Sequence, residues 1–194
     1  VVEKNTLGNE TWQIPAHCPV CQTRLETRGK HHFCPNADCP AQVRARLIWF
    51  CKKMRIRYMG PKTIDMLISQ KLVRDPQDIY ALSAEELRAL KGFGDKKTRS
   101  LKKSIEESKT RPFHIVLSAL GIPGLGPRTV KRLEHAGFDS VDKILEAGIP
   151  GLVQVKGIGE ITGPGIIEGF TPRMRKTIDA LKKAARKKKQ VTVL

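Results

Sequence analysis

Four cysteines near the start of the sequence form two close pairs that could bind a metal ion. Two residues separate Cys18 from Cys21, four separate Cys34 from Cys39, and twelve lie between the pairs. Two such pairs, each on a tight turn, can direct four thiolates toward one tetrahedral ion, and that filled shell leaves no position for a catalytic water. We therefore expect a structural zinc site, with turns at Gly29 and at the Pro-Asn pair 35–36 between the ligands.

Other interpretations of these cysteines stay open at this point. Cys18 and Cys21 alone would make a redox-active dithiol, and all four would make two disulfides or hold an iron–sulfur cluster. One histidine could also replace a cysteine, and the candidates are His17, His31 and His32. Five cysteines, four of them within 22 residues, are not typical of a secreted disulfide scaffold. We expect the fifth, Cys51, to be an ordinary buried thiol because it follows the apolar run 47–50.

A second pattern, glycine, apolar residue, glycine and then residues suited to a helix start, occurs four times. The four copies are Tyr58-Met59-Gly60-Pro61-Lys62-Thr63, Gly92-Phe93-Gly94-Asp95-Lys96-Lys97-Thr98, Gly124-Leu125-Gly126-Pro127-Arg128-Thr129 and Gly157-Ile158-Gly159-Glu160-Ile161-Thr162. Their last glycines are 34, 32 and 33 residues apart, so we expect a repeated structural unit.

Between two helices, this pattern would make an anion-binding turn. The glycines permit positive φ angles and close approach of a ligand, the central apolar residue plugs the core, and the next helix offers free N–H groups. We assign no catalytic residue. The residues expected to contact phosphate are Gly60, Lys62, Thr63, Gly92, Gly94, Lys96, Lys97, Thr98, Gly124, Gly126, Arg128, Thr129, Gly157, Gly159 and Thr162.

Helix signals flank these turns. The segment 84–90 precedes one turn, and 98–105 follows it with apolar residues four apart. Ser83 begins a capping-box pattern, while Pro61 and Pro127 suit the first turn of a helix. The expected unit is helix, short turn, helix, and the expected fold class is mainly α: a small four-cysteine zinc finger followed by four tandem helix-hairpin-helix units.

The charge of the chain indicates a polyanionic partner. A formal net charge of +17 and a pI near 10.0 favour nucleic acid, and about +11 remains without the six positive charges of the segment 182–189. No apolar run approaches the roughly 18 residues that cross a bilayer, and no signal peptide is apparent, so we expect an intracellular protein. The absence of an initial Met suggests a fragment of a longer chain.

The four repeats resemble the helix-hairpin-helix elements that grip the DNA backbone without reading sequence. The first copy departs from that pattern at Tyr58, and the fourth lacks a following cation because Glu160 and Ile161 stand there. A tetracysteine knuckle followed by four such units is similar to the bacterial NAD-dependent DNA ligases over nearly the whole chain. The phrases that carry this resemblance are 17–21, 34–42, 71–76 with 78–82, and 117–122.

The resemblance implies a domain order and a partner. Residues 1–14 would end an OB-fold domain with its linker, 15–41 would be the zinc finger, 42–186 the helix-hairpin-helix DNA-binding domain and 187–194 a basic tail. The implied partner is nicked double-stranded DNA, bound by a cytoplasmic, nucleoid-associated monomer with no membrane contact, in replication and repair of DNA damage. Zinc would be structural, while NAD and Mg²⁺ would bind the parent enzyme outside this segment.

The resemblance also implies that this segment does not adenylate. The family's adenylated lysine lies in a Lys-x-Asp-Gly motif, and no Asp-Gly pair occurs here. We therefore expect a ligase as the parent enzyme and an inactive segment by itself. Two alternatives remain: a stand-alone or repair-nuclease-associated DNA-binding module, and an all-helical protein-interaction domain whose basic surface is incidental.

Overall fold

The computed structural model describes residues 15–186, which divide into two compact units between Val43 and Arg44. The segments that we expected to end an OB-fold domain (1–14) and to form a basic tail (187–194) lie outside the described residues.

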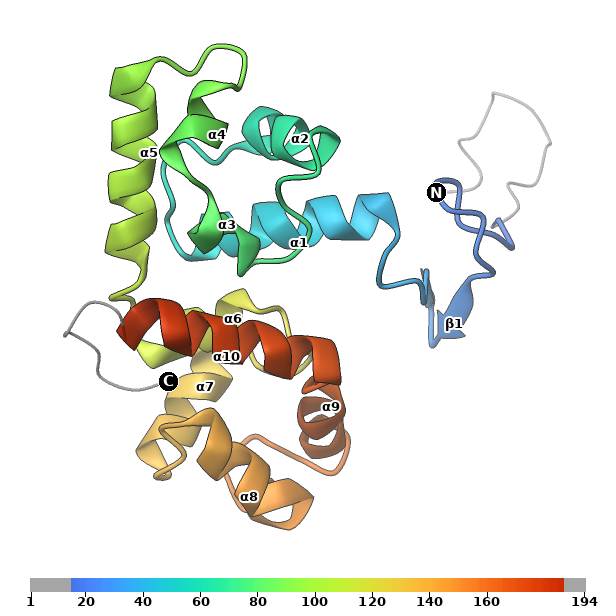
Figure 1. Ribbon diagram of the computed structural model, residues 1–194. Coiled ribbons are helices and arrows are strands. Elements are labelled where there is room, and N and C mark those ends of the chain that lie inside the picture. Colours follow the sequence, from blue (N-terminus) through green and yellow to red (C-terminus); the bar gives the residue numbers. More distant parts are fainter. Residues whose placement is uncertain (1–14, 187–194) are drawn as a thin grey trace, which may run out of the picture. The chain divides into compact units, whose positions relative to one another are not determined.

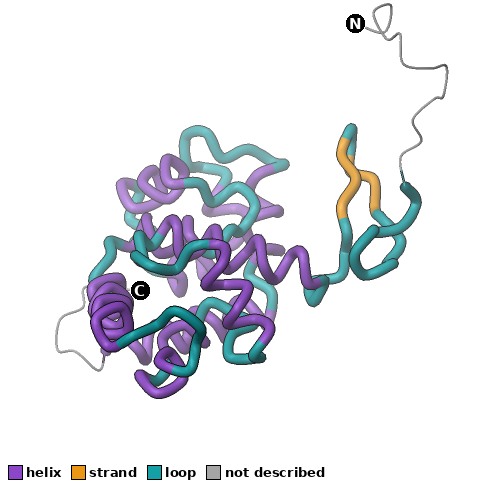
Figure 2. The backbone as a smooth tube through the Cα atoms, turned by 90° about the horizontal axis from the view of Figure 1, so that it is seen from above, coloured by secondary structure: helices purple, strands orange, loops and turns teal. Residues whose placement is uncertain are grey.

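The first unit contains a two-stranded antiparallel ribbon, drawn in orange in Figure 2. Strands β1 (Glu26–Arg28) and β2 (His31–Phe33) pair so that Thr27 lies opposite His32. Gly29 occupies the first position of the two-residue turn with φ +63°, a conformation that favours glycine. This turn confirms the expected role of Gly29.

The first unit has very little core. Among its described residues, only Cys18, Cys39 and Val43 are buried. A unit of this size cannot hide enough apolar surface to fold on that basis alone, so its stability must come from elsewhere. The two buried cysteines point to the cluster described below.

The described part of the chain contains ten helices, which confirms the expected mainly helical fold. They are α1 (Pro40–Lys53), α2 (Pro61–Ser69), α3 (Asp78–Ala81), α4 (Ala84–Arg88), α5 (Asp95–Ser108), α6 (Phe113–Ala119), α7 (Pro127–His135), α8 (Val141–Leu152), α9 (Thr162–Gly169) and α10 (Pro172–Arg186). None of them is both long and apolar enough to cross a membrane, within the described residues.

Local sequence explains where several helices begin. The Ser83 hydroxyl accepts a hydrogen bond from the Glu86 N–H at 3.1 Å, and the Glu86 carboxylate accepts one from the Ser83 N–H at 2.7 Å. This capping box starts α4. Pro61 and Pro127 stand in the first turns of α2 and α7, where a missing N–H costs nothing.

Each glycine pattern joins two helices, as we expected. We call the turns hairpin 1 (58–60), hairpin 2 (92–94), hairpin 3 (124–126) and hairpin 4 (157–159), and they lead into α2, α5, α7 and α9 respectively. The amphipathic helix α5 buries Leu101 and Ile105, four residues apart, at 0% and 1% exposure. The turn before hairpin 1 contacts α5 directly, because the Arg57 N–H donates to the Ser104 hydroxyl at 2.8 Å.

The last helix, α10, connects the two halves of the second unit, and Figure 1 shows it running between α1–α5 and α7–α9. Arg173 forms an ion pair with Asp75 at 2.8 Å, and the Thr177 hydroxyl donates to the side-chain oxygen of Gln77 at 2.8 Å. Near its other end, Lys182 forms an ion pair with Asp142 at 3.0 Å. These contacts hold both halves against one helix.

Candidate metal centre and nucleic-acid interface

The four predicted ligand cysteines come together in the first unit. The sulfur atoms of Cys18, Cys21, Cys34 and Cys39 all lie within 4.8 Å of one another. The Sγ–Sγ distance is 3.9 Å between Cys18 and Cys39 and 3.4 Å between Cys21 and Cys34. Zinc–sulfur bonds of about 2.3 Å at tetrahedral angles would separate the sulfurs by about 3.8 Å, so the donor set fits a zinc ion.

Two turns bring the sulfurs to one point. The Cys18 carbonyl accepts the N–H of Gln22 at 2.9 Å, and the Cys18 N–H donates to the Thr23 carbonyl at 2.8 Å. The Asn36 carbonyl accepts the Cys39 N–H at 3.0 Å, while the Asn36 side chain accepts the Asp38 N–H at 2.9 Å. The second turn confirms the expected role of the Pro-Asn pair.

The thiols of this cluster are free, so the alternative of two disulfides is not formed. Hydrogen bonds with the side chain and backbone of Thr23 lower the pKa of Cys21 to about 6, whereas desolvation raises the pKa of Cys34 to about 12. As zinc ligands the four sulfurs would be thiolates, and the divalent cation at their centre would offset the repulsion between them.

The other candidate ligands and the fifth cysteine are placed differently. His17, His31 and His32 are exposed, and the group of possible metal ligands found in the described residues contains none of them. Cys51 is 1% exposed in α1, and burial raises the pKa of its thiol to about 12. It is therefore the inert buried thiol that we expected.

The first position of every hairpin has a left-handed backbone. The φ angle is +65° at Tyr58, +80° at Gly92, +80° at Gly124 and +86° at Gly157. Hairpin 1 therefore keeps the conformation of the others although a tyrosine replaces the glycine. The departure that we noted in its sequence does not change the shape of its turn.

The central residue of each hairpin packs inward. Met59, Phe93, Leu125 and Ile158 are 4%, 5%, 1% and 2% exposed. In hairpins 2, 3 and 4 the N–H of this residue donates to the carbonyl three residues earlier, at 3.0, 3.1 and 2.9 Å. The expectation that these apolar residues plug the core is confirmed.

The second glycine of each hairpin has no internal reason to be glycine. A Cβ added at Gly60, Gly94, Gly126 or Gly159 would meet nothing within 4 Å, and none of the four has a left-handed φ. The carbonyl of each accepts the N–H four residues later, at 2.9–3.0 Å, so the first helical turn is formed in all four copies. Open space in front of this turn leaves its free N–H groups accessible to a ligand.

Most of the predicted cations are available at this surface. Lys62, Lys96 and Arg128 are exposed, with no carboxylate partner among the described residues. Lys97 is engaged within hairpin 2, because its ammonium lies 3.8 Å from the centre of the Phe93 ring and 3.5 Å from the Gly92 carbonyl oxygen. It stiffens the turn and leaves less of its charge free.

The four predicted threonines lie deeper than the cations. Thr63 and Thr98 are 7% and 1% exposed, and Thr129 and Thr162 are half-buried. The structure thus places the side chains of Thr63 and Thr98 in the core, where their hydroxyls do not face a ligand. The prediction that Thr63 and Thr98 contact DNA therefore depends on the backbone around them and not on their side chains.

The sequence analysis did not predict that Asp95, an acidic residue next to hairpin 2, is neutralised by an ion pair. Asp95 is the first residue of α5, where a carboxylate would repel a phosphate. Arg88 in α4 forms an ion pair with it at 2.7 Å. The seven-residue separation spans a turn between helices, so helical spacing alone does not reveal the pair.

Hairpin 4 has no cation following its glycines, as the sequence indicated. Glu160 is exposed, and Ile161 is 93% exposed, so the isoleucine side chain lies almost entirely in solvent.

Comparisons with known proteins agree with this geometry. Residues 54–107 and 116–170 each match the model of the "SAM-like Helix-hairpin-helix tandem" family. The first match contains hairpins 1 and 2 and the second contains hairpins 3 and 4, so the four units pair in chain order.

Individual relatives are named as ligases. The chain is 36% identical to the "DNA ligase" of Borrelia hermsii over 181 residues, which are 89% of this chain and 27% of that protein. It is 37% identical to the "DNA ligase" of Borrelia duttonii over 90% of this chain. It is 36% identical to that of Leptospira interrogans over 97% of this chain. The chain thus spans less than a third of the length of these relatives.

Proposed function

Because the chain belongs to the family of tandem helix-hairpin-helix domains, we propose that it binds the phosphate backbone of double-stranded DNA without reading base sequence. The observation that carries the proposal is the second glycine of each hairpin. A glycine that neither backbone conformation nor internal packing requires is explained by a ligand that approaches the backbone closely. Free helix N–H groups and exposed cations at the same place make that ligand an anion.

The proposal extends to the parent protein. The similarity to bacterial ligases supports the role of DNA-clamping segment in an NAD-dependent DNA ligase, rather than in a stand-alone or nuclease-associated module. In that role the segment would act as a monomer and hold a nicked DNA duplex. The parent enzyme would serve DNA replication and repair in the cytoplasm, at the nucleoid. Adenylation, with NAD and Mg²⁺, would take place in other domains.

The metal belongs to the same proposal. Cys18, Cys21, Cys34 and Cys39 would bind one zinc ion, which supplies a structural crosslink and no reaction chemistry. The first unit has only three buried residues in its described part, so the free energy of metal binding would account for most of its stability.

The test of DNA binding is the double substitution Gly94→Val with Gly126→Val. It leaves the net charge at +17 and places two side chains in the space that a phosphate would use. We expect duplex affinity to fall more than tenfold, about 1.4 kcal/mol or more. In the parent enzyme the same pair should slow nick sealing and spare self-adenylation.

A second test pair and two controls make the result specific. Gly94→Thr with Gly126→Thr adds nearly the same volume, and threonine can cap a helix, so this pair should fold if valine disturbs the helix starts. Ala45→Val with Ala81→Val adds bulk at exposed alanines outside the hairpins. Deletion of Lys187, Lys188 and Lys189 removes charge and should cost less than the glycine pair. If the folded glycine variants bind as the parent does while the tail deletion abolishes binding, the hairpins are only packing turns.

A further inference from the structure

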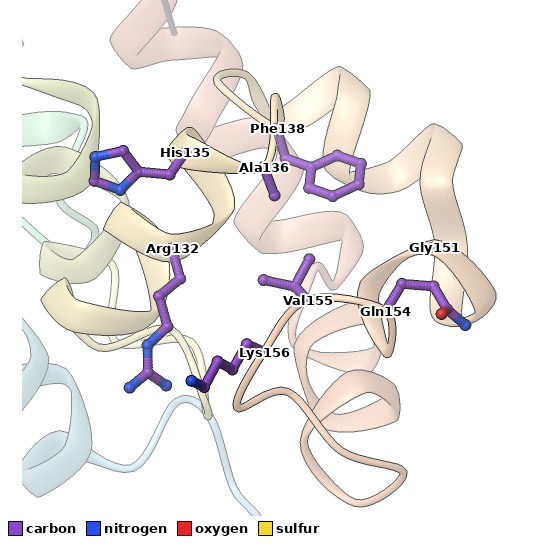
Figure 3. A pocket seen from close by; sticks show the side chains of 8 residues that line it. All are labelled: Arg132, His135, Ala136, Phe138, Gly151, Gln154, Val155 and Lys156. Carbon is purple, nitrogen blue, oxygen red and sulfur yellow. The ribbon is translucent and has the colours of Figure 1, made fainter.

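Hairpin 4, which lacks a cation of its own, borders a cavity that is lined by cations. The cavity has a volume of about 500 Å³ and lies between α7 and the segment that leads from α8 into hairpin 4. Figure 3 shows Arg132 on α7 and Lys156 immediately before Gly157, with their charged ends at the same end of the cavity. The cavity is therefore built from two consecutive helix-hairpin-helix units.

The guanidinium of Arg132 lies directly against hairpin 4. A Cβ at Gly157 would stand 3.1 Å from the Cζ atom of Arg132 and would clash with one of its nitrogens. The φ of +86° favours glycine at position 157, and any larger residue there would also displace the flexible end of the Arg132 side chain.

The cavity has positive charge and no compensating acid. None of its eight lining residues is a carboxylate, and Arg132 and Lys156 have no ion-pair partner among the described residues. Two unpaired cations at one end of a cavity repel each other and attract an anion. Arginine in particular binds a phosphate through two parallel N–H donors.

We propose that this cavity is a phosphate-binding site, in which Arg132 of one unit and Lys156 provide the charge that the sequence of hairpin 4 lacks. The inference rests on the proposed function, because it takes the occupant to be a backbone phosphate of the bound duplex. The volume is in the range of small-ligand sites and admits a phosphodiester with part of its sugars. Hairpin 4 is then a DNA contact rather than a packing turn, and one of its two cations, Arg132, lies 25 residues before Gly157 in the sequence.

The experiment compares two charge-matched variants of the zinc-loaded chain. Arg132→Gln with Lys156→Gln changes the cavity, and Lys176→Gln with Lys183→Gln removes the same charge from exposed lysines of α10. Anisotropy with a labelled duplex is measured over a series of salt concentrations. We expect the cavity pair to lower affinity about tenfold or more and to reduce the log–log salt slope by about one, the value for one lost phosphate, and the α10 pair to change both less.

Each outcome decides between the proposals. If the cavity pair matches the α10 pair while Gly94→Val with Gly126→Val still weakens binding, this inference fails and the proposed function stands. If the parent chain shows no salt-dependent duplex binding, both fail. Should the cavity pair disturb the circular dichroism spectrum, Lys156→Gln alone, in an exposed loop, provides the same comparison against Lys176→Gln.

A second arm identifies the source of the phosphate. Amide resonances of Lys156 and Gly157 are followed during titration with duplex, with inorganic phosphate and with a mononucleotide. Larger shifts with the duplex, and displacement of the small anions by it, support a backbone phosphate. A mononucleotide that saturates the site and is not displaced by duplex overturns the assignment.

Discussion

The two glycines of hairpin 2 differ in what they contribute to stability. Gly92 has φ +80° and open space around it, so an added Cβ would cost only the strain of a left-handed backbone. Gly94 is the N-cap of α5 with φ −88°, where any residue fits and threonine caps well. We expect Gly92→Ala to lower the free energy of unfolding by about 1 kcal/mol and Gly94→Thr to leave it nearly unchanged. Urea unfolding at constant zinc concentration measures both.

Tyr58 provides the converse test. It holds φ +65° without being glycine and is 50% exposed, so replacing it removes the strain together with the contacts of a half-exposed ring. We expect Tyr58→Gly to raise the free energy of unfolding by about 0.5–1 kcal/mol. A loss of stability would mean that the tyrosine ring makes contacts worth more than the strain.

At this scale the sequence predicted which residues gather at each turn but not their separate roles. The sequence does not distinguish a glycine that is needed for a positive φ from one that is needed for the approach of a ligand. Only the φ angles and the space around each Cα separate Gly92 from Gly94. For the same reason Thr63 and Thr98 were assigned to the surface, although the first turn of their helices directs them into the core.

At the scale of elements, the zinc finger and the helices should respond separately to mutation. Cys34→Ser removes one of four ligands, and we expect it to abolish stoichiometric zinc and loosen residues 15–43 while the helical signal persists, because the second unit has its own core. Elemental analysis, circular dichroism and limited proteolysis report these effects. Full zinc retention in this variant, or no stoichiometric zinc in fresh parent protein, contradicts the assignment.

Cys51→Ser is the matched control. Its sulfur is buried in α1 and outside the metal cluster, so a hydroxyl there loses packing and gains an unsatisfied polar group. We expect this variant to keep its zinc and to lower the midpoint of helical unfolding. If Cys34→Ser loses zinc and keeps its helices, while Cys51→Ser keeps zinc and has less stable helices, then Cys34 belongs to the metal site and Cys51 to the helical core.

Elements with strong local signals could be predicted from sequence, and those that depend on distant contacts could not. The capping box at Ser83, the prolines that begin α2 and α7, and the apolar spacing of α5 are encoded within a few residues. The role of α10 is not, because its partners Asp75 and Gln77 lie about a hundred residues earlier. The same limit hid Arg132, which serves a hairpin in the next unit.

For the whole molecule, the distribution of charge decides how binding depends on salt. Ion pairs such as Arg44 with Asp65, Arg88 with Asp95 and Lys143 with Asp139 neutralise part of the positive charge. The cations at hairpins 1, 2 and 3 have no such partner among the described residues, so they remain available to phosphates. The net charge of +17 alone therefore does not show that the positive charge is unevenly distributed over the chain.

We therefore expect duplex binding that weakens steeply with salt and is indifferent to base sequence. Each neutralised phosphate contributes about −0.9 to the slope of log affinity against log salt, so contacts from four hairpins give a slope of about −4. Phosphates carry no sequence information, and duplexes of equal length and different sequence should bind alike. A slope near zero, or a sharp preference for one sequence, contradicts phosphate clamping.

Deletion of Lys187, Lys188 and Lys189 distinguishes the contribution of the hairpins from that of the tail. If the slope of log affinity against log salt stays steep, the contacts come from the folded hairpins. If the slope falls toward zero, they come from the tail.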